Sequence, residues 1–220
     1  MNYLSPLEML YKWEQEKPNE IYLSQPIEGV WHNWTWKEVA EEVRKMAAYI
    51  KTLDMPQGSK IALLSKNCAH WMMTDMAIMM SGYVSVPLYP NLNAASLEKI
   101  LNHSEAKLLF VGKLDDYAIM KPGVPADLPC ITFPFYSEDY PKWNDVTKDI
   151  APIQENIIRE AQDLATIIYT SGTTGDPKGV MHKFFNFSFA TTHASEALRL
   201  NNESFFSYLP LCHIAERLLV

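Results

Sequence analysis

The residues best suited to chemistry lie in one short polar stretch, Thr170 to Gly179, which reads Thr-Ser-Gly-Thr-Thr-Gly-Asp-Pro-Lys-Gly. Four hydroxyl side chains, two glycines and one lysine fall between Thr170 and Lys178. Glycines let backbone N–H groups approach an anion, hydroxyls donate hydrogen bonds to it, and a lysine neutralises its charge. This combination predicts a loop that binds a polyphosphate.

A polar surface loop is the alternative, but such loops rarely follow a buried strand with so many donors. The apolar and β-branched residues 167–169, directly before the stretch, predict such a strand. A Walker A loop is excluded, because that motif needs Gly-Lys followed by Ser or Thr. Here Lys178 stands between Pro177 and Gly179, so the loop is of another kind.

A second candidate segment runs from Ser207 to Arg217 with the sequence Ser-Tyr-Leu-Pro-Leu-Cys-His-Ile-Ala-Glu-Arg. A strand is predicted at 205–209, and His213 follows the Pro-Leu turn after it, where ligands meet open α/β sheets. A lone histidine is more often structural. Glu216 and Arg217 could equally form an exposed pair on a helix, so they are left outside the predicted site.

Both segments resemble motifs of the adenylate-forming superfamily, which contains acyl-CoA synthetases, luciferases and peptide-synthetase adenylation domains. The stretch Tyr169–Gly179 resembles the signature of that superfamily. The segment Ser207–Arg217 resembles its Pro-Leu-x-His segment, in the form typical of long-chain fatty acid–CoA ligases. The two occur in the family's order, and the resemblance makes a site role for His213 the favoured interpretation.

The resemblance implies a reaction in two halves. A carboxylate attacks the α-phosphorus of ATP, giving an acyl-adenylate and pyrophosphate, and a thiol, usually coenzyme A, then displaces AMP. The first half needs charge neutralisation and alignment rather than a protein nucleophile. Magnesium would bridge phosphate oxygens. The implied site consists of His213 as the catalytic residue and, around the phosphates, Thr170, Ser171, Gly172, Thr173, Thr174, Gly175, Pro177, Lys178 and Gly179, with Thr174 assigned to magnesium through the ATP phosphates.

The resemblance also implies that residues 1–220 are the N-terminal portion of an AMP-binding domain. The family's adenine-binding strand, its magnesium-linked glutamate, its ribose-binding aspartate and its C-terminal domain with a lysine would all follow Val220. We therefore expect an N-terminal fragment of a long-chain fatty acid–CoA ligase that is inactive alone. A truncated, non-catalytic binding module is the alternative, and a luciferase-like relative is a third.

The elements that must position these motifs follow an α/β rhythm. Alternating strands and helices predict a parallel α/β layer. The resemblance implies the layered α/β/α sheets of the large N-terminal domain of adenylate-forming enzymes, incomplete in this chain. The proline-rich segment 112–163 marks a possible junction between subdomains. Helices are predicted at 6–16, 71–80 and 184–200. A further helix is predicted to begin after Thr35, which forms a capping-box pattern with Glu38, and another after an N-cap at Asn93. Strands are predicted at 21–24, 30–34, 60–64, 83–89, 107–111 and 205–209.

Four features of these elements allow both a structural and a functional interpretation. The methionine-rich helix 71–80 is interpreted as a core helix rather than a lipid-contact surface, because it is apolar nearly all round. Asp75 within it is expected to cap or pair locally. His103 is expected to cap a helix C-terminus. The phenylalanines at 184, 185, 187 and 189 are expected in the core.

The composition excludes several classes of protein. A hydrophobic content of 48% is ample for a core, and a net charge of −7 argues against a general nucleic-acid binder. The three cysteines lack paired spacing, which indicates free thiols in a reducing compartment. No signal peptide is evident, and the apolar stretch 71–88 is too interrupted for a membrane span. We expect a cytoplasmic protein, with peripheral membrane contact possible, whose partners are fatty acid, ATP and coenzyme A.

Overall fold

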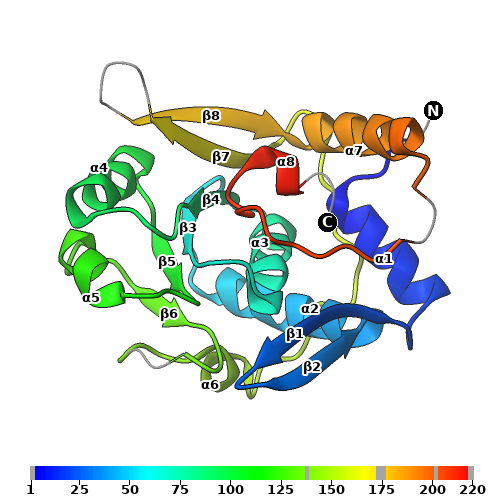
Figure 1. The fold of residues 1–220 in the computed structure, drawn as a ribbon, viewed down its shortest axis with the longest axis horizontal. Coiled ribbons are helices and arrows are strands. Elements are labelled where there is room, and N and C mark those ends of the chain that lie inside the picture. Colours follow the sequence, from blue (N-terminus) through cyan, green and yellow to red (C-terminus); the bar gives the residue numbers. More distant parts are fainter. Residues whose placement is uncertain (1–2, 137–138, 172–176, 201–202, 218–220) are drawn as a thin grey trace.

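The computed structural model describes residues 3–136, 139–171, 177–200 and 203–217 of the 220-residue chain. A six-stranded sheet with helices against it forms the centre, and a two-stranded sheet lies apart from it (Figure 1). The helices are α1 (Pro6–Glu16), α2 (Trp36–Thr52), α3 (Ala69–Ser81), α4 (Ala94–Ser104), α5 (Tyr117–Met120), the 3-10 helix η1 (Lys121–Gly123), α6 (Trp143–Thr147), α7 (Phe184–Leu198) and α8 (Ile214–Arg217). The strands are β1 (Ile21–Ile27), β2 (Val30–Thr35), β3 (Lys60–Leu64), β4 (Val84–Leu88), β5 (Leu108–Val111), β6 (Cys130–Thr132), β7 (Leu164–Ser171) and β8 (Pro177–Lys183).

The main sheet has the strand order β6-β5-β3-β4-β7-β8 and is mostly parallel. Strand β3 pairs in parallel with β4 and β5, β5 with β6, and β4 with β7, whereas β8 runs antiparallel to β7. Parallel neighbours need a crossover, which α3 supplies between β3 and β4. Helix α4 lies in the connection from β4 to β5, which brings the chain back to the other side of β3. The predicted α/β class is confirmed, and the carboxyl end of β7 lies at the same sheet edge as those of β3, β4 and β5.

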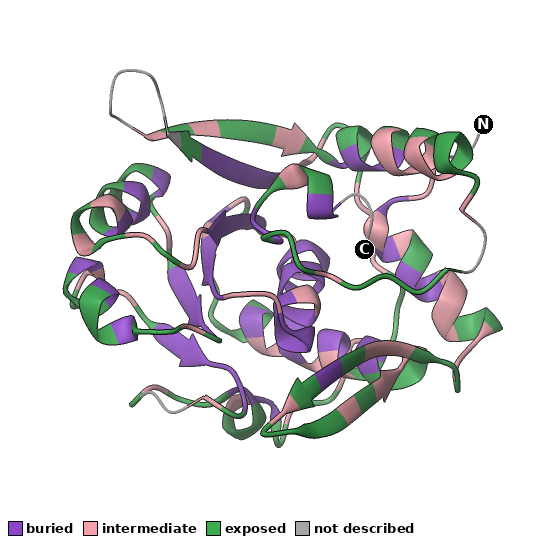
Figure 2. Cartoon of the chain, in the orientation of Figure 1, coloured by how far each residue is buried: buried purple, intermediate pink, exposed green. Residues whose placement is uncertain are grey.

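Two buried clusters cover the two faces of this sheet. Side chains alternate along a strand, so Ile61 and Leu63 of β3 join one cluster, with α1, α2 and α3. Their neighbours Ala62 and Leu64 join the other cluster, with α4. Figure 2 shows the central strands buried along their length, as expected of a parallel sheet that is covered on both faces.

The predicted helix starts are confirmed in atomic detail. The Oγ1 of Thr35 accepts a hydrogen bond from the backbone N of Glu38 at 3.2 Å, and the Oε2 of Glu38 accepts one from the backbone N of Thr35 at 2.7 Å. The Oδ1 of Asn93 accepts one from the backbone N of Ser96 at 2.8 Å. Both caps satisfy N–H groups that have no partner inside the helix.

The interpretation of residues 71–80 as a core helix is confirmed. Every residue of α3 is buried except Met72, which is half-buried. In α7 the outcome is divided, because Phe184 and Phe187 are buried whereas Phe185 and Phe189 are 42% and 43% exposed. Those two rings lie on the outer side of the helix.

The strand predicted at 205–209 is wrong. This segment has no regular secondary structure, and it pairs with no strand in the part of the chain that the structure describes. The side chain of Asn67 holds it instead, donating to the Oγ of Ser207 at 2.8 Å and to the carbonyl of Leu209 at 2.7 Å, and accepting from the N of Leu211 at 3.0 Å. An apolar run can favour an extended backbone, but a strand also needs a neighbouring strand edge.

Three further expectations concern cysteines, membranes and domains. All three cysteines are buried free thiols, as predicted. No helix among the described residues has the length and hydrophobicity to cross a membrane. Within the proline-rich segment 112–163, β6 pairs with β5 and so belongs to the main sheet. The division of residues 1–220 into subdomains stays a prediction.

Candidate functional site

The predicted phosphate loop joins the two strands of an antiparallel hairpin, β7 and β8. Tyr169 pairs with Gly179, Thr170 with Lys178, and Ser171 with Pro177. The loop itself, 172–176, lies outside the described residues. The predicted phosphate contacts of Gly172, Thr173, Thr174 and Gly175 therefore stay predictions, and the structure describes the two strand ends that hold them.

Thr170 and Lys178 form the last described pair of this hairpin with exposed side chains. Residues directly opposite each other in an antiparallel pair project to the same face, with Cβ atoms about 5 Å apart. A hydroxyl donor and an ammonium group therefore stand side by side at the base of the loop. Such a pair can neutralise and hydrogen-bond an oxyanion.

Burial anchors the strand that leads into the loop. Ile167, Ile168 and Tyr169 are 8%, 5% and 5% exposed, which confirms the predicted buried strand. The Oη of Tyr169 lies 2.7 Å from the Nδ1 of His103, in the last turn of α4. Burial raises the pKa of Tyr169. His103 is the basic residue of the last turn of α4, as expected, and its ring also ties α4 to β7.

Gly179 has a packing reason for being glycine. A Cβ at this position would lie 2.7 Å from the Cγ2 of Ile167 and 3.3 Å from the Cζ of Tyr169. Real Cβ contacts are not so short, so a larger residue would push β7 and β8 apart. Position 179 thus requires a glycine because the backbone of β8 lies close to side chains of its partner strand, β7.

His213 lies at the start of α8, and its side chain is exposed. The Nδ1 of His213 accepts a hydrogen bond from the backbone N of Ala215 at 3.2 Å, and its own backbone N donates to the carbonyl of Pro210 at 2.8 Å. In the neutral ring, the proton is therefore on Nε2. No described residue accepts a hydrogen bond from that N–H, so it can donate to a ligand at the surface.

Arg217, at the end of the same helix, connects it to the core. Its Nη2 lies 2.6 Å from the Oδ2 of Asp75 in α3, and its Nη1 donates to the Oγ1 of Thr166 in β7 at 3.0 Å. The guanidinium also lies 4.9 Å from the ring centre of Phe187 in α7. Arg217 therefore holds the His213 helix against the strand that carries the phosphate loop, as Figure 1 shows for α8 and β7.

Sequence reasoning missed this connection. Arg217 and Glu216 are buried, at 7% and 4% exposure, so the exposed-pair alternative is wrong. The local partner expected for Asp75 is also wrong, because its partner is 142 residues away. The available signal was the lone carboxylate in an apolar helix, since a buried charge needs an opposite charge.

The cysteine of the second motif offers no nucleophile. Cys212 is 2% exposed, and burial raises the pKa of its thiol to about 12. The thiolate is the reactive form, so this residue is inert at neutral pH.

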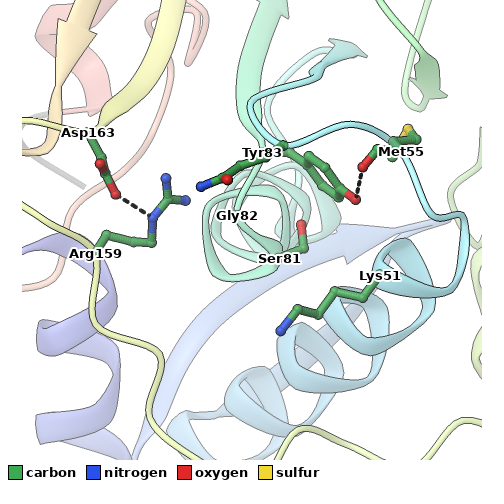
Figure 3. Close-up of a pocket in the computed structure, with 8 residues that line it drawn as sticks. Lys51, Met55, Ser81, Gly82, Tyr83, Arg159 and Asp163 are labelled. Atoms are coloured by element: carbon green, nitrogen blue, oxygen red, sulfur yellow. Dashed lines mark hydrogen bonds and ion pairs between the residues drawn. The ribbon is translucent and has the colours of Figure 1, made fainter.

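A hollow of about 350 Å³ lies elsewhere, beside the start of β4 (Figure 3). There Arg159 pairs with Asp163 at 3.0 Å and donates to the carbonyl of Met79 at 2.9 Å. Figure 3 also shows the hydroxyl of Tyr83 on the carbonyl of Met55, at 3.0 Å. Ligands of open α/β sheets bind at the carboxyl ends of the strands. This hollow lies at the amino end of β4, so it is not at the edge of the sheet where ligands bind. Its polar groups tie the loop before β7 to α3.

Metal ligands do not gather in the described part of the chain. No group of three or more His, Cys, Asp or Glu side chains lies close enough there to hold an ion. The residue assigned to magnesium, Thr174, lies outside the described residues.

Comparison with known proteins gives a concordant result. Residues 10–220 match the family described as AMP-binding enzyme. Long chain acyl-CoA synthetase 2 of Arabidopsis thaliana is 28% identical, over 98% of this chain and 36% of that protein. The long-chain-fatty-acid–CoA ligase FadD15 of Mycobacterium tuberculosis is 28% identical, over 95% of this chain and 36% of that protein. The chain thus spans about a third of the length of these relatives.

The fold is shared with a solved structure. The long-chain-fatty-acid–CoA ligase FadD1 of Archaeoglobus fulgidus superposes with a TM-score of 0.79 at 23% identity, covering 99% of this chain and 44% of that one.

Proposed function

The chain belongs to the AMP-binding enzyme family, and we propose that it is the N-terminal part of an enzyme that activates a long-chain fatty acid with ATP. The product would be an acyl-adenylate, which coenzyme A then converts to acyl-CoA. The relatives named above are long-chain acyl-CoA synthetases, which supports the chain length of the substrate. They do not favour the alternative of a non-catalytic binding module.

One observation carries the proposal: the exposed pair of Thr170 and Lys178 at the base of the hairpin loop. In the proposed reaction this pair and the loop hydroxyls bind the β- and γ-phosphates of ATP. Lys178 would offset charge on the departing pyrophosphate, and Thr170 would fix its orientation. Neither group forms a covalent bond to the substrate.

His213 would act at the reacting atoms. Its Nδ1 is occupied by the backbone N of Ala215, so Nε2–H is the donor that can reach an oxygen of the acyl carboxylate or of the α-phosphate. Such a hydrogen bond would hold the carboxylate in line with the phosphorus and strengthen as charge develops. Magnesium would be bound mainly by phosphate oxygens, with Thr174 as its protein contact.

ATP binding by the chain itself tests the phosphate site. We expect isothermal titration calorimetry to detect ATP binding, and Lys178→Ala to weaken it by about tenfold or more, since a charge-assisted hydrogen bond is lost. Lys183→Ala is the matched control, because Lys183 is an exposed lysine on the same strand whose Nζ contacts Gln162. Absence of ATP binding, or equal loss in both variants, would contradict the proposal.

Turnover tests the fragment status. The chain spans about a third of its relatives, so we expect no sustained release of AMP when ATP and a long-chain fatty acid are supplied. Multiple turnovers, measured by AMP formation in excess over protein, would show that residues 1–220 suffice for catalysis and would contradict this expectation.

A further inference from the structure

The segment that leads to His213 has little burial of its own. It follows α7 and passes across the molecule to α8, as the red part of the chain in Figure 1 shows. The side chains of Phe205, Phe206 and Tyr208 are exposed, so apolar contacts do not fix this part of the backbone. The segment also pairs with no described strand. Its position therefore depends on polar contacts.

Asn67, in the loop after β3, supplies those contacts. Its Nδ2 donates to the Oγ of Ser207 at 2.8 Å and to the carbonyl of Leu209 at 2.7 Å, and its Oδ1 accepts from the backbone N of Leu211 at 3.0 Å. Both N–H groups of the carboxamide are thus used. In a parallel sheet, one residue likewise bonds a carbonyl and an N–H that lie two positions apart on its neighbour. The side chain of Asn67 therefore takes the place of a strand partner.

His213 lies between this tether and a second anchor. Its backbone N donates to the carbonyl of Pro210 at 2.8 Å, so the turn that carries the histidine closes on the tethered residues. The backbone N of Ala215 donates to the Nδ1 of the ring at 3.2 Å. Beyond the ring, Arg217 is held by Asp75 at 2.6 Å. With both flanks held, the imidazole has a defined place and direction.

We propose that Asn67 is a positioning residue for His213. This inference rests on the proposed function, in which the Nε2–H of His213 donates to an oxygen of the α-phosphate or of the acyl carboxylate. Asn67 does not touch the substrate in this role. It fixes the backbone from which the histidine projects, and a hydrogen bond weakens steeply when its donor moves out of line.

Calorimetric titrations with ATP and with pyrophosphate separate this role from the phosphate site. Pyrophosphate offers Thr170 and Lys178 the groups that they are proposed to bind, but it has no α-phosphate. We expect Asn67→Ala to weaken ATP binding at least about threefold and pyrophosphate binding by less than about twofold. Added to His213→Ala, it should cause no further loss, because both changes remove the same contact. Asn102→Ala, at an exposed asparagine on α4, is the matched control and should bind both ligands like the wild type.

A measurement without ligand tests the positioning itself. The N–H of Ala215 is bonded to the ring of His213, so the temperature dependence of its amide proton shift in NMR spectra reports that bond in the folded chain. The dependence should be weak in the wild type and in Asn102→Ala. It should become as steep as for a solvent-exposed amide in Asn67→Ala and in the isosteric Asn67→Asp, which loses both donated bonds. A general loss of stability does not change this readout, because only the folded chain contributes to it.

The outcomes distinguish this inference from the function on which it rests. Failure of the wild-type chain to bind ATP would contradict the proposed function, and the amide proton of Ala215 would then decide on Asn67 alone. The inference is overturned by unchanged ATP affinity in Asn67→Ala, by equal losses for ATP and pyrophosphate, by a further loss in the double variant, or by a Ala215 bond that persists in both Asn67 variants. Unfolding of both variants, seen by circular dichroism, would show that Asn67 holds the whole fold and would overturn it as well.

Discussion

Replacement of Arg217 by methionine tests whether the buried ion pair with Asp75 anchors α8 to the core. The change removes the cation but keeps an apolar side chain of comparable length. It leaves Asp75 buried with its Oδ2 unpaired, in addition to an Oδ1 that already has no partner among the described residues. Thr166 also loses the hydrogen bond from Nη1.

The expected cost follows from the burial of both partners, whose side chains are 3% and 11% exposed. Removing one partner of a buried pair costs about 3–5 kcal/mol, because an uncompensated charge remains. For a chain of this length that loss lowers Tm by about 10 °C. Replacing both residues, as Arg217→Met/Asp75→Leu, should return stability to within about 1–2 kcal/mol of the wild type, since no charge is then stranded.

Urea unfolding followed by circular dichroism and tryptophan fluorescence measures these differences. Lys45→Met is the control, because it breaks the partly exposed pair with Glu41, for which a loss of about 0.5 kcal/mol is expected. If Arg217→Met costs no more than this control, or if the double variant is less stable than the single one, the ion pair does not anchor α8.

Three further predictions concern other parts of the fold. Gly179→Ala should destabilise the chain by about 1–3 kcal/mol in urea unfolding, because the new Cβ meets Ile167 at 2.7 Å, and adding Ile167→Ala should recover part of that loss. Burial lowers the pKa of His70 to about 4, so the unfolded chain binds a proton there that the folded chain does not. This group should therefore lower the free energy of unfolding by about 3 kcal/mol as the pH drops from about 6.5 to about 4. Urea unfolding at several pH values should show that His70→Phe lacks this contribution. The thiols of Cys68, Cys130 and Cys212 are all buried, so in the native chain they should react with a disulfide reagent far more slowly than in urea. Fast reaction of any one of them in the native chain would contradict this burial.

Local sequence determined much of the architecture. The capping box at Thr35 and Glu38 and the N-cap at Asn93 appear as predicted, because each involves residues three positions apart in the chain. Strand β3 and helix α3, which is buried except at Met72, follow from hydrophobic pattern alone. The alternation of such elements was sufficient to predict a parallel α/β sheet and a strand leading into the phosphate loop.

Tertiary structure decided the features that depend on distant partners. His103 meets Tyr169 across 66 residues, and Arg217 meets Asp75 across 142. Residues 205–209 carry an apolar run, yet whether they form a strand depended on a neighbouring edge that the run does not encode. A sequence pattern reports the preferences of neighbouring residues, whereas buried charges and strand edges are satisfied by whatever the folded chain brings beside them.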